Sequence, residues 1–398
     1  MDAVLDYAGM DFSDLLINYQ AGFVRRGLLG ELLFGCYQHV PYDVGKACLM
    51  LIISSAAICL TLLWRVCRRM CYSPLLLMSG FVLQFMALSS VVGVRRDYLC
   101  LTLAFLAFWS YRCWCDKGAG HGFCRADFWI VLCNIVIIVS ILLHEGAWFY
   151  TMPLICVHYF GMSYRQTGDW RKALMRCCVL ALPVSLVMLC LFVNKGSMTA
   201  AQTIWASWQD LFARYPRMQT TTPDLGASVY CLSCTTMDYV TGCSKADWGF
   251  MYGGVLPMFP LTLLMFPLLL YLVTRANASG VLSSHMLPRQ RLVLITAIML
   301  LQLMAMAPFF LLLSCDYGRL YCYWIVSTLF ASYVFGNDIA CLPQWVRRWA
   351  EKIQLWMDGH AWLDTPLGYA LILLLTSCNM VGGAALGAIP LYRMIVWS

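Results

Sequence analysis

The chain has 398 residues, of which 61% are apolar and only 12% are charged, and its mean hydropathy is +0.72. Soluble domains contain about a quarter charged residues. This composition therefore excludes an ordinary soluble enzyme and a disordered chain. It also excludes a nucleic-acid binder with a solvated basic face. The net charge of +7 is therefore interpreted by asking on which side of a membrane each basic residue lies.

Apolar runs long enough to cross a bilayer, which takes about 20 residues per helix, recur along the whole chain. They predict an all-α, polytopic integral membrane protein in which residues 1–398 form a single transmembrane domain. The run over 128–160 is broken only at 144–146, which fits either two crossings with a tight turn or one crossing and a broken helix. The expected crossings lie near 47–64, 74–93, 98–112, 128–143, 147–162, 174–194, 249–274, 292–314, 319–336 and 367–389.

Basic residues set the orientation, because short loops rich in Lys and Arg stay cytoplasmic. They gather in alternate loops, at 65–69, 112–125, 165–176, 275–291 and 347–352. That side is expected to be the cytoplasm, which places residues 1–46 and the long loop 195–248 outside. The segment 337–366 is expected to contain a cytoplasmic interfacial helix, since Trp345, Trp349 and Trp356 recur at helical spacing beside basic residues. Residues 11–36 are expected to form a similar amphipathic helix on the outer face.

Several ionisable residues lie in segments that are expected to be outside. The arginines among them are unusual, because the positive-inside rule favours arginine on the cytoplasmic side. The ionisable residues occur in four outer segments and are Asp11, Asp14, Arg25, Arg26 and Glu31, then Arg95, Arg96 and Asp97, then His144 and Glu145, and finally Asp316 and Arg319. Ionisable groups near membrane depth are costly and usually face a cavity or a partner. Arginine pairs bind phosphate oxygens through two hydrogen bonds and stay protonated, which indicates an anionic, lipid-linked molecule reached from the outer leaflet.

A purely structural interpretation accounts for the same residues. Arg95 and Arg96 could pair with acidic neighbours or with headgroups. His144 and Glu145 could form a packed turn, and Asp316 and Arg319 could be an i, i+3 pair at a helix start.

The long loop 195–248 and the cysteines leave further alternatives open. The loop's aromatic residues could stack on sugar rings or rest on headgroups; they are Trp205, Trp208, Phe212, Tyr215, Tyr230, Tyr239 and Trp248. Most of the 21 cysteines lie in apolar runs, where they behave as small buried hydrophobes. Cys231, Cys234 and Cys243 share the loop and could form one disulfide, and the cysteine spacing predicts no metal site.

Four short motifs resemble those of bacterial multispanning proteins of surface-polysaccharide assembly. These are the O-antigen and capsular polysaccharide polymerases and related membrane-embedded GT-C-like glycosyltransferases that use polyprenyl-linked donors. The motifs are the stretch Gly22 to Glu31 (GFVRRGLLGE), the Arg-Arg-Asp turn at 95–97, the His-Glu-Gly turn at 144–146 and the Asp-Tyr-Gly-Arg turn at 316–319.

The resemblance implies an inverting transfer of a glycan from a polyprenyl (undecaprenyl) pyrophosphate to an acceptor hydroxyl, at the outer face of the bacterial inner membrane. The expected partners are the lipid-linked oligosaccharide, the bilayer and other polysaccharide-assembly proteins, with no nucleic acid. A resident cofactor is not expected, although such enzymes sometimes use a divalent metal ion. The candidate catalytic residues are His144, Glu145, Asp14 and Asp97, and the candidate pyrophosphate-binding residues are Arg25, Arg26, Arg95, Arg96, Asp316 and Arg319.

Two other classes of function compete with this one. A transporter or flippase for the lipid-linked oligosaccharide would use the same arginines, but it should show internal repeats and a charged path between both faces. A non-catalytic membrane subunit would use them only for structure.

Overall fold

The computed structural model describes residues 13–40, 42–70, 96–118, 123–214, 227–234, 288–308, 317–336, 338–360 and 367. Within these ranges the chain is helical and contains no strand, so the expected all-α class is confirmed there. The expected crossings at 74–93 and 249–274, and the one at 367–389 apart from residue 367, lie outside the described residues. The chain divides into two compact units: the first comprises 1–62, 88–155 and 175–235, and the second 63–87, 156–174 and 236–398.

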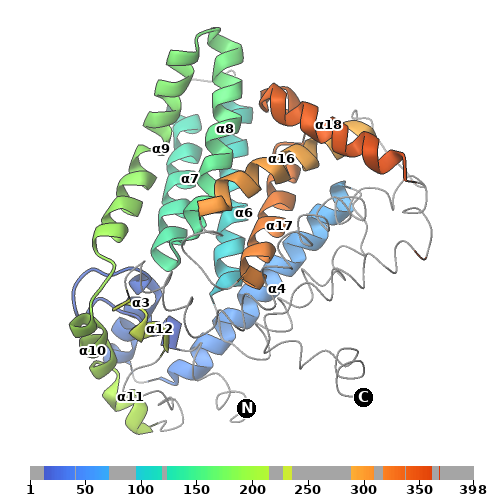
Figure 1. Cartoon of the computed structure of the whole chain (residues 1–398). Coiled ribbons are helices and arrows are strands. Elements are labelled where there is room, and N and C mark those ends of the chain that lie inside the picture. The colour runs from blue at the N-terminus through green and yellow to red at the C-terminus, as the bar shows by residue number, and fades with distance from the viewer. Residues whose placement is uncertain are drawn as a thin grey trace. The chain divides into compact units, whose positions relative to one another are not determined.

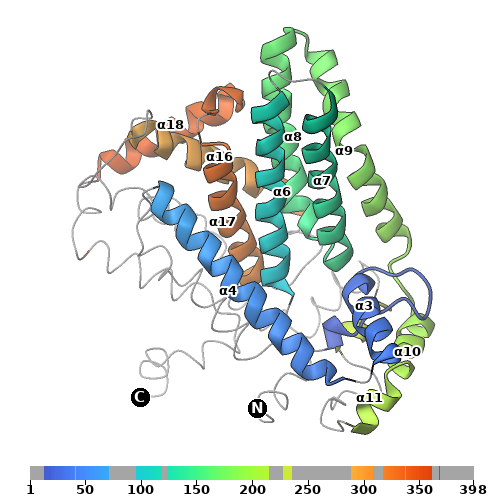
Figure 2. The same ribbon diagram turned by 180° about the vertical axis from the view of Figure 1, so that it is seen from behind.

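The first unit holds long helices and a group of short ones. Its long helices are α4 (Val44–Met70), α6 (Asp97–Gly118), α7 (Phe123–Leu143), α8 (Ala147–Thr167) and α9 (Trp170–Val193), of which α4, α8 and α9 continue into the second unit. Helix α6 packs along α7, and α3 (Gly27–His39) contacts α7. In Figures 1 and 2, α3 lies with α10 (Met198–Ala206), α11 (Gln209–Arg214) and α12 (Ala227–Tyr230) beyond one end of α7.

The second unit includes three helices in the C-terminal half of the chain. Helix α16 (Pro288–Pro308) contacts both α17 (Tyr317–Val334) and α18 (Gln344–Asp358), and the short 3-10 helix η4 (Ile339–Cys341) precedes α18. The close approach of α8 to η4 requires a glycine, because a Cβ at Gly161 would overlap the carbonyl of Cys341.

Among the described residues, two helices are long and apolar enough to cross a membrane, α4 over Val44–Arg69 and α9. Shorter apolar helical stretches are Phe128–Leu143, Val293–Pro308 and Cys322–Val334. Most of the apolar side chains of α9 are exposed in the structure, among them Val179, Leu186, Leu189 and Phe192. The other crossings of the predicted ten remain predictions.

The structure tests the expected helices at residues 128–160 and 11–36. Residues 128–160 form two helices, because α7 ends at Leu143 and α8 begins at Ala147. The expectation of one amphipathic helix over 11–36 is wrong, since residues 18–26 form turns and α3 begins only at Gly27. The physical reason is the left-handed backbone at Gly22 (φ 97°) and Arg26 (φ 65°), which a continuous right-handed helix cannot contain.

Candidate functional site: an arginine–carboxylate cluster

The turn before α3 places two arginines side by side at the start of that helix. Arg26 occupies the N-cap position with φ 65°, a conformation that costs a non-glycine residue free energy and is seen mostly where the surroundings enforce it. Glu31, one turn into α3, accepts a hydrogen bond from the backbone N–H of Tyr19 (2.8 Å) and so ties the turn back onto the helix. This hydrogen bond fixes the backbone of the turn, and the backbone in turn sets the direction in which the Arg25 and Arg26 side chains point.

Two glycines of the same motif are required by close packing. A Cβ at Gly27 would overlap the ring of Tyr19, and a Cβ at Gly30 would overlap the carbonyl oxygen of Ile17. Gly35, further along α3, has open space around it. The pattern of small residues in the motif thus follows from the chain folding back across the first turns of α3.

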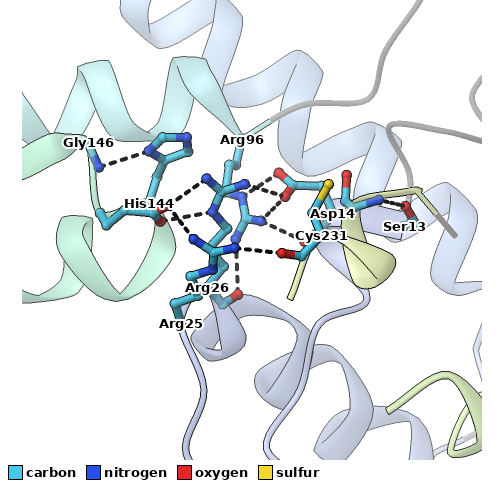
Figure 3. Close-up of polar contacts among 10 residues, drawn as sticks. Ser13, Asp14, Arg25, Arg26, Arg96, His144, Gly146 and Cys231 are labelled. Atoms are coloured by element: carbon cyan, nitrogen blue, oxygen red, sulfur yellow. Dashed lines mark hydrogen bonds and ion pairs between the residues drawn. The ribbon is translucent and has the colours of Figure 1, made fainter. Parts of the chain in front are cut away.

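Arg96 and Asp14 form the buried centre of the site (Figure 3). The Nε of Arg96 donates to Asp14 Oδ2 (2.7 Å), and its Nη2 donates to the Asp14 carbonyl (2.7 Å) and forms an ion pair with Asp14 Oδ1. Its Nη1 donates to the carbonyl of Arg26 (3.0 Å). The Arg96 residue is only 1% exposed. All three of its nitrogens are therefore engaged, and one guanidinium links the segment at 13–14, the turn before α3 and the start of α6.

Arg26 binds the turn between α7 and α8. Its Nε donates to Glu145 Oε2 (2.8 Å) and its Nη2 to Glu145 Oε1 (2.6 Å), the two-point geometry that arginine favours with a carboxylate. A longer contact of 3.6 Å joins its Nη1 to Asp14 Oδ1. Arg26 therefore lies between the two carboxylates.

Arg25 makes fewer short hydrogen bonds than Arg26 or Arg96. Its Nη2 donates to the carbonyl of Cys231 (2.7 Å), and its Nη1 is 3.7 Å from Glu145 Oε1. Its Nε is buried and has no hydrogen-bond partner among the described residues. The side chains of Arg25 and Arg26 are 18% and 21% exposed, whereas that of Arg96 is fully buried. We call Asp14, Arg25, Arg26, Arg96 and Glu145 the arginine–carboxylate cluster; it has three cations and two anions.

His144 lies next to the cluster, and its ring orientation is set by its own turn. The Nδ1 of the buried imidazole accepts a hydrogen bond from the backbone N–H of Gly146 (3.0 Å). The neutral ring must then carry its proton on Nε2. In this arrangement the basic nitrogen of His144 is occupied, which is unfavourable for the role of general base.

The two carboxylates of the cluster are strongly biased toward their charged form. Burial alone would raise the pKa of Asp14, but Arg96 and Arg26 hold that pKa well below its ordinary value of 3.8. Burial likewise opposes ionisation of Glu145, but the nearby Arg26 and Arg25 guanidinium groups bring its pKa well below the ordinary value of 4.5. Both groups are weak bases while the arginines stay in place.

The remaining candidate residues lie in other elements or outside the described part of the chain. Asp97 is fully buried in the first turn of α6, where a carboxylate is favoured by the helix dipole. Arg319 lies in the first turn of α17, which belongs to the second unit. Arg95, Asp316 and Asp11 lie outside the described residues.

Three of the described aromatic residues of the long loop are buried in a small core. Trp208 is 1% exposed, donates its Nε1–H to the carbonyl of Leu16 (2.8 Å) and packs edge-on against Phe34. Trp205 and Phe212 are also buried and contact each other. These three rings cannot stack on a sugar in this arrangement. Tyr230 is about half exposed, and Tyr215, Tyr239 and Trp248 lie outside the described residues.

The residues that anchor this loop beside the cluster carry no clear signal in the sequence. Asn18 donates to Ser207 Oγ (2.9 Å), and the Ser228 backbone N–H donates to Ser13 Oγ (3.2 Å). The carbonyl of Cys231 binds Arg25 through the main chain, which leaves no sequence signal. Cys231 and Cys234 do not form a disulfide with each other, and Cys243 lies outside the described residues. The described residues contain no group of His, Cys, Asp and Glu suited to a metal ion.

Comparisons with known protein families, with curated proteins and with solved structures give no match to this chain.

Proposed function

We propose that the chain is a membrane-embedded glycosyltransferase, of the polysaccharide polymerase type, that takes a glycan from a polyprenyl pyrophosphate. The observation that carries the proposal is the arginine–carboxylate cluster. Three arginines and two carboxylates from four separate segments meet there, and the two arginines at its edge are partly exposed. If the cluster served only to hold the segments together, paired charges would be enough. Arg25 is a third, incompletely paired guanidinium, and such a group is suited to bind an added anion.

The membrane placement rests on α4 and α9 and on the distribution of basic residues. Exposed apolar side chains along a whole helix, as on α9, need a cover that excludes water. Lipid tails supply it in a ten-crossing, multi-pass protein of the bacterial inner membrane. The basic loops then face the cytoplasm, and the arginine–carboxylate cluster faces the outer leaflet, where a lipid-linked donor would arrive.

The three arginines have different roles in this proposal. Arg96 is a positioning residue, because it is fully buried and bound to Asp14 and to the Arg26 carbonyl. Arg25 and Arg26 are the substrate-contacting residues, since their side chains are partly exposed. A pyrophosphate carries oxygens on two phosphorus atoms and can accept hydrogen bonds from both.

Binding of the pyrophosphate also supplies the base that the transfer needs. Glu145 occupies the Nε and Nη2 donors of Arg26, and the remaining Nη1 faces Asp14, so in this proposal the phosphate replaces Glu145 at Nε and Nη2. Released from Arg26, the buried Glu145 carboxylate becomes more basic. It then takes the proton of the acceptor hydroxyl as that oxygen attacks the anomeric carbon. The bond from this carbon to the pyrophosphate breaks, and the leaving oxygen's charge is met by Arg25 and Arg26.

A binding measurement tests the proposal. The full chain in lipid nanodiscs is titrated with polyprenyl pyrophosphate and with the uncharged polyprenol. We expect tight binding of the pyrophosphate only, and a loss of about 10- to 100-fold in Arg25→Gln, because a hydrogen bond to a charged group contributes about 1.5–3 kcal/mol. Arg214→Gln, which removes an exposed arginine from α11 of the same unit, is the matched control and should bind as the wild type does. Equal affinity for the two lipids, or unchanged binding in Arg25→Gln, would refute the proposal.

A further inference from the structure

Helix α18 has two faces, and in the described part of the chain only one of them packs against the rest of the protein. Val346, Ala350 and Gln354 are buried, and Gln354 Nε2 donates to Thr296 Oγ1 of α16 (3.1 Å). Figures 1 and 2 show α18 alongside α16. This contact fixes the rotation of α18 about its own axis, so the direction of its opposite face is also fixed.

The opposite face is a stripe of aromatic and basic side chains. Its members recur at i, i+3, i+4, i+7, i+10 and i+11, the spacing of one helical face. They are Trp345, Arg348, Trp349, Lys352, Leu355 and Trp356, and all six are exposed. The stripe contains no acidic residue. Glu351, the exposed acid of the helix, falls at its edge.

The cations of this stripe have no anionic partner in the described part of the chain. The only contact of Lys352 there is with the ring of Trp349, 5.3 Å from its centroid, and no ion pair there involves Arg348. Three indole rings, each about half exposed, lie beside two uncompensated positive charges. Such a surface on a folded protein requires a cover that is apolar and anionic at once.

We propose that the stripe on α18 binds the headgroup layer of an anionic phospholipid surface. Tryptophan is enriched at the membrane interface, where the ring meets the acyl boundary and its N–H meets the headgroups. The Arg348 and Lys352 side chains are long enough to reach phosphates from the same depth. The charge of the stripe is complementary to anionic lipids and not to zwitterionic ones. This inference is independent of glycosyl transfer, because it concerns a different unit of the chain.

Tryptophan quenching by brominated lipids tests the proposal on the full chain in nanodiscs. The signal of the stripe is the difference between the wild type and the variant with Trp345→Phe, Trp349→Phe and Trp356→Phe. Brominated phosphatidylglycerol should quench this signal at a several-fold lower mole fraction than brominated phosphatidylcholine. In Arg348→Gln/Lys352→Gln that preference should be lost, because the two basic residues that attract anionic headgroups are gone.

The control variant is Lys195→Gln/Arg214→Gln, which removes the same charge from the other unit and should retain the preference. Equal quenching by the two brominated lipids would overturn the proposal. Quenching by aqueous iodide in place of the lipids would also overturn it, because the stripe would then face water or a soluble partner.

Discussion

Replacing Arg96 tests the division of roles among the three arginines. Arg96→Met keeps an unbranched apolar side chain of similar length but removes the charge and every donor. Asp14, which is 6% exposed, would then be buried without its main partner. Breaking a buried ion pair on one side costs about 3–5 kcal/mol. At roughly 2–4 °C per kcal/mol for a unit of this size, the midpoint of thermal unfolding should fall by on the order of 10 °C.

The comparison with Arg25→Gln makes this prediction specific. Arg25 is partly exposed and has one short hydrogen bond, so its loss should cost about 1 kcal/mol. The double variant Arg96→Met/Asp14→Asn should be more stable than the sum of the single changes allows, because it leaves no unpaired charge. The assay is thermal unfolding in nanodiscs followed by circular dichroism. An Arg96→Met midpoint within about 2 °C of the wild type would refute the assignment of Arg96 as the buried positioning residue.

Three further predictions follow from the same contacts. The pKa values of Asp14 and Glu145 are lower in the folded protein than their ordinary values of 3.8 and 4.5. Their ion pairs therefore stabilise the fold fully at a pH above these ordinary values. This stabilisation is lost as the pH falls below them toward the folded-state pKa values. Acidification from about pH 6 to about pH 3 should therefore lower the unfolding midpoint of the wild type more than that of Asp14→Asn, and equal shifts would contradict the assignment. Gly30→Ala should reduce the yield of folded protein, since the added Cβ would overlap the Ile17 carbonyl. Gly35→Ala on the same helix should instead stabilise the protein by up to about 1 kcal/mol, because the added Cβ meets open space. Unfolding midpoints of the two variants measure this contrast. Glu145→Gln should bind polyprenyl pyrophosphate at least as tightly as the wild type, because Arg26 is freed, yet transfer no glycan; weaker binding together with full transfer would exclude Glu145 as the base.

Much of the helical organisation could be predicted from the sequence. Apolar runs give the positions of α4, α6, α7, α8 and α9 to within a few residues, because the length of such a run reflects the helix it forms. Charge placement also indicated that Asp14, Arg25, Arg26, Arg96 and Glu145 lie on one face, and the structure brings them together. Their functional roles remain predictions.

What could not be predicted depends on tertiary packing. Nothing in the sequence distinguishes Arg96, with a fully buried side chain, from Arg25, because the difference comes from where α6 meets the segment at residue 14. The left-handed backbone at Arg26 replaced an expected helix, since the turn is enforced by Glu31 and by contacts across the chain. The sequence places Trp208 in an aromatic outer loop, but the residue is buried and packs against Phe34 of α3.

The central claim is that the arginine–carboxylate cluster uses a lipid pyrophosphate donor for glycan transfer. The most direct measurement is an analysis of lipid-linked and surface glycans in cells that lack the protein, complemented separately with the wild type, Arg25→Gln and Arg214→Gln. We predict that a polyprenyl-linked repeat unit accumulates on the outer leaflet, and that the wild type and Arg214→Gln clear it while Arg25→Gln does not. A glycan profile that is unchanged by loss of the protein would contradict the account, and accumulation on the inner leaflet would indicate a transporter instead.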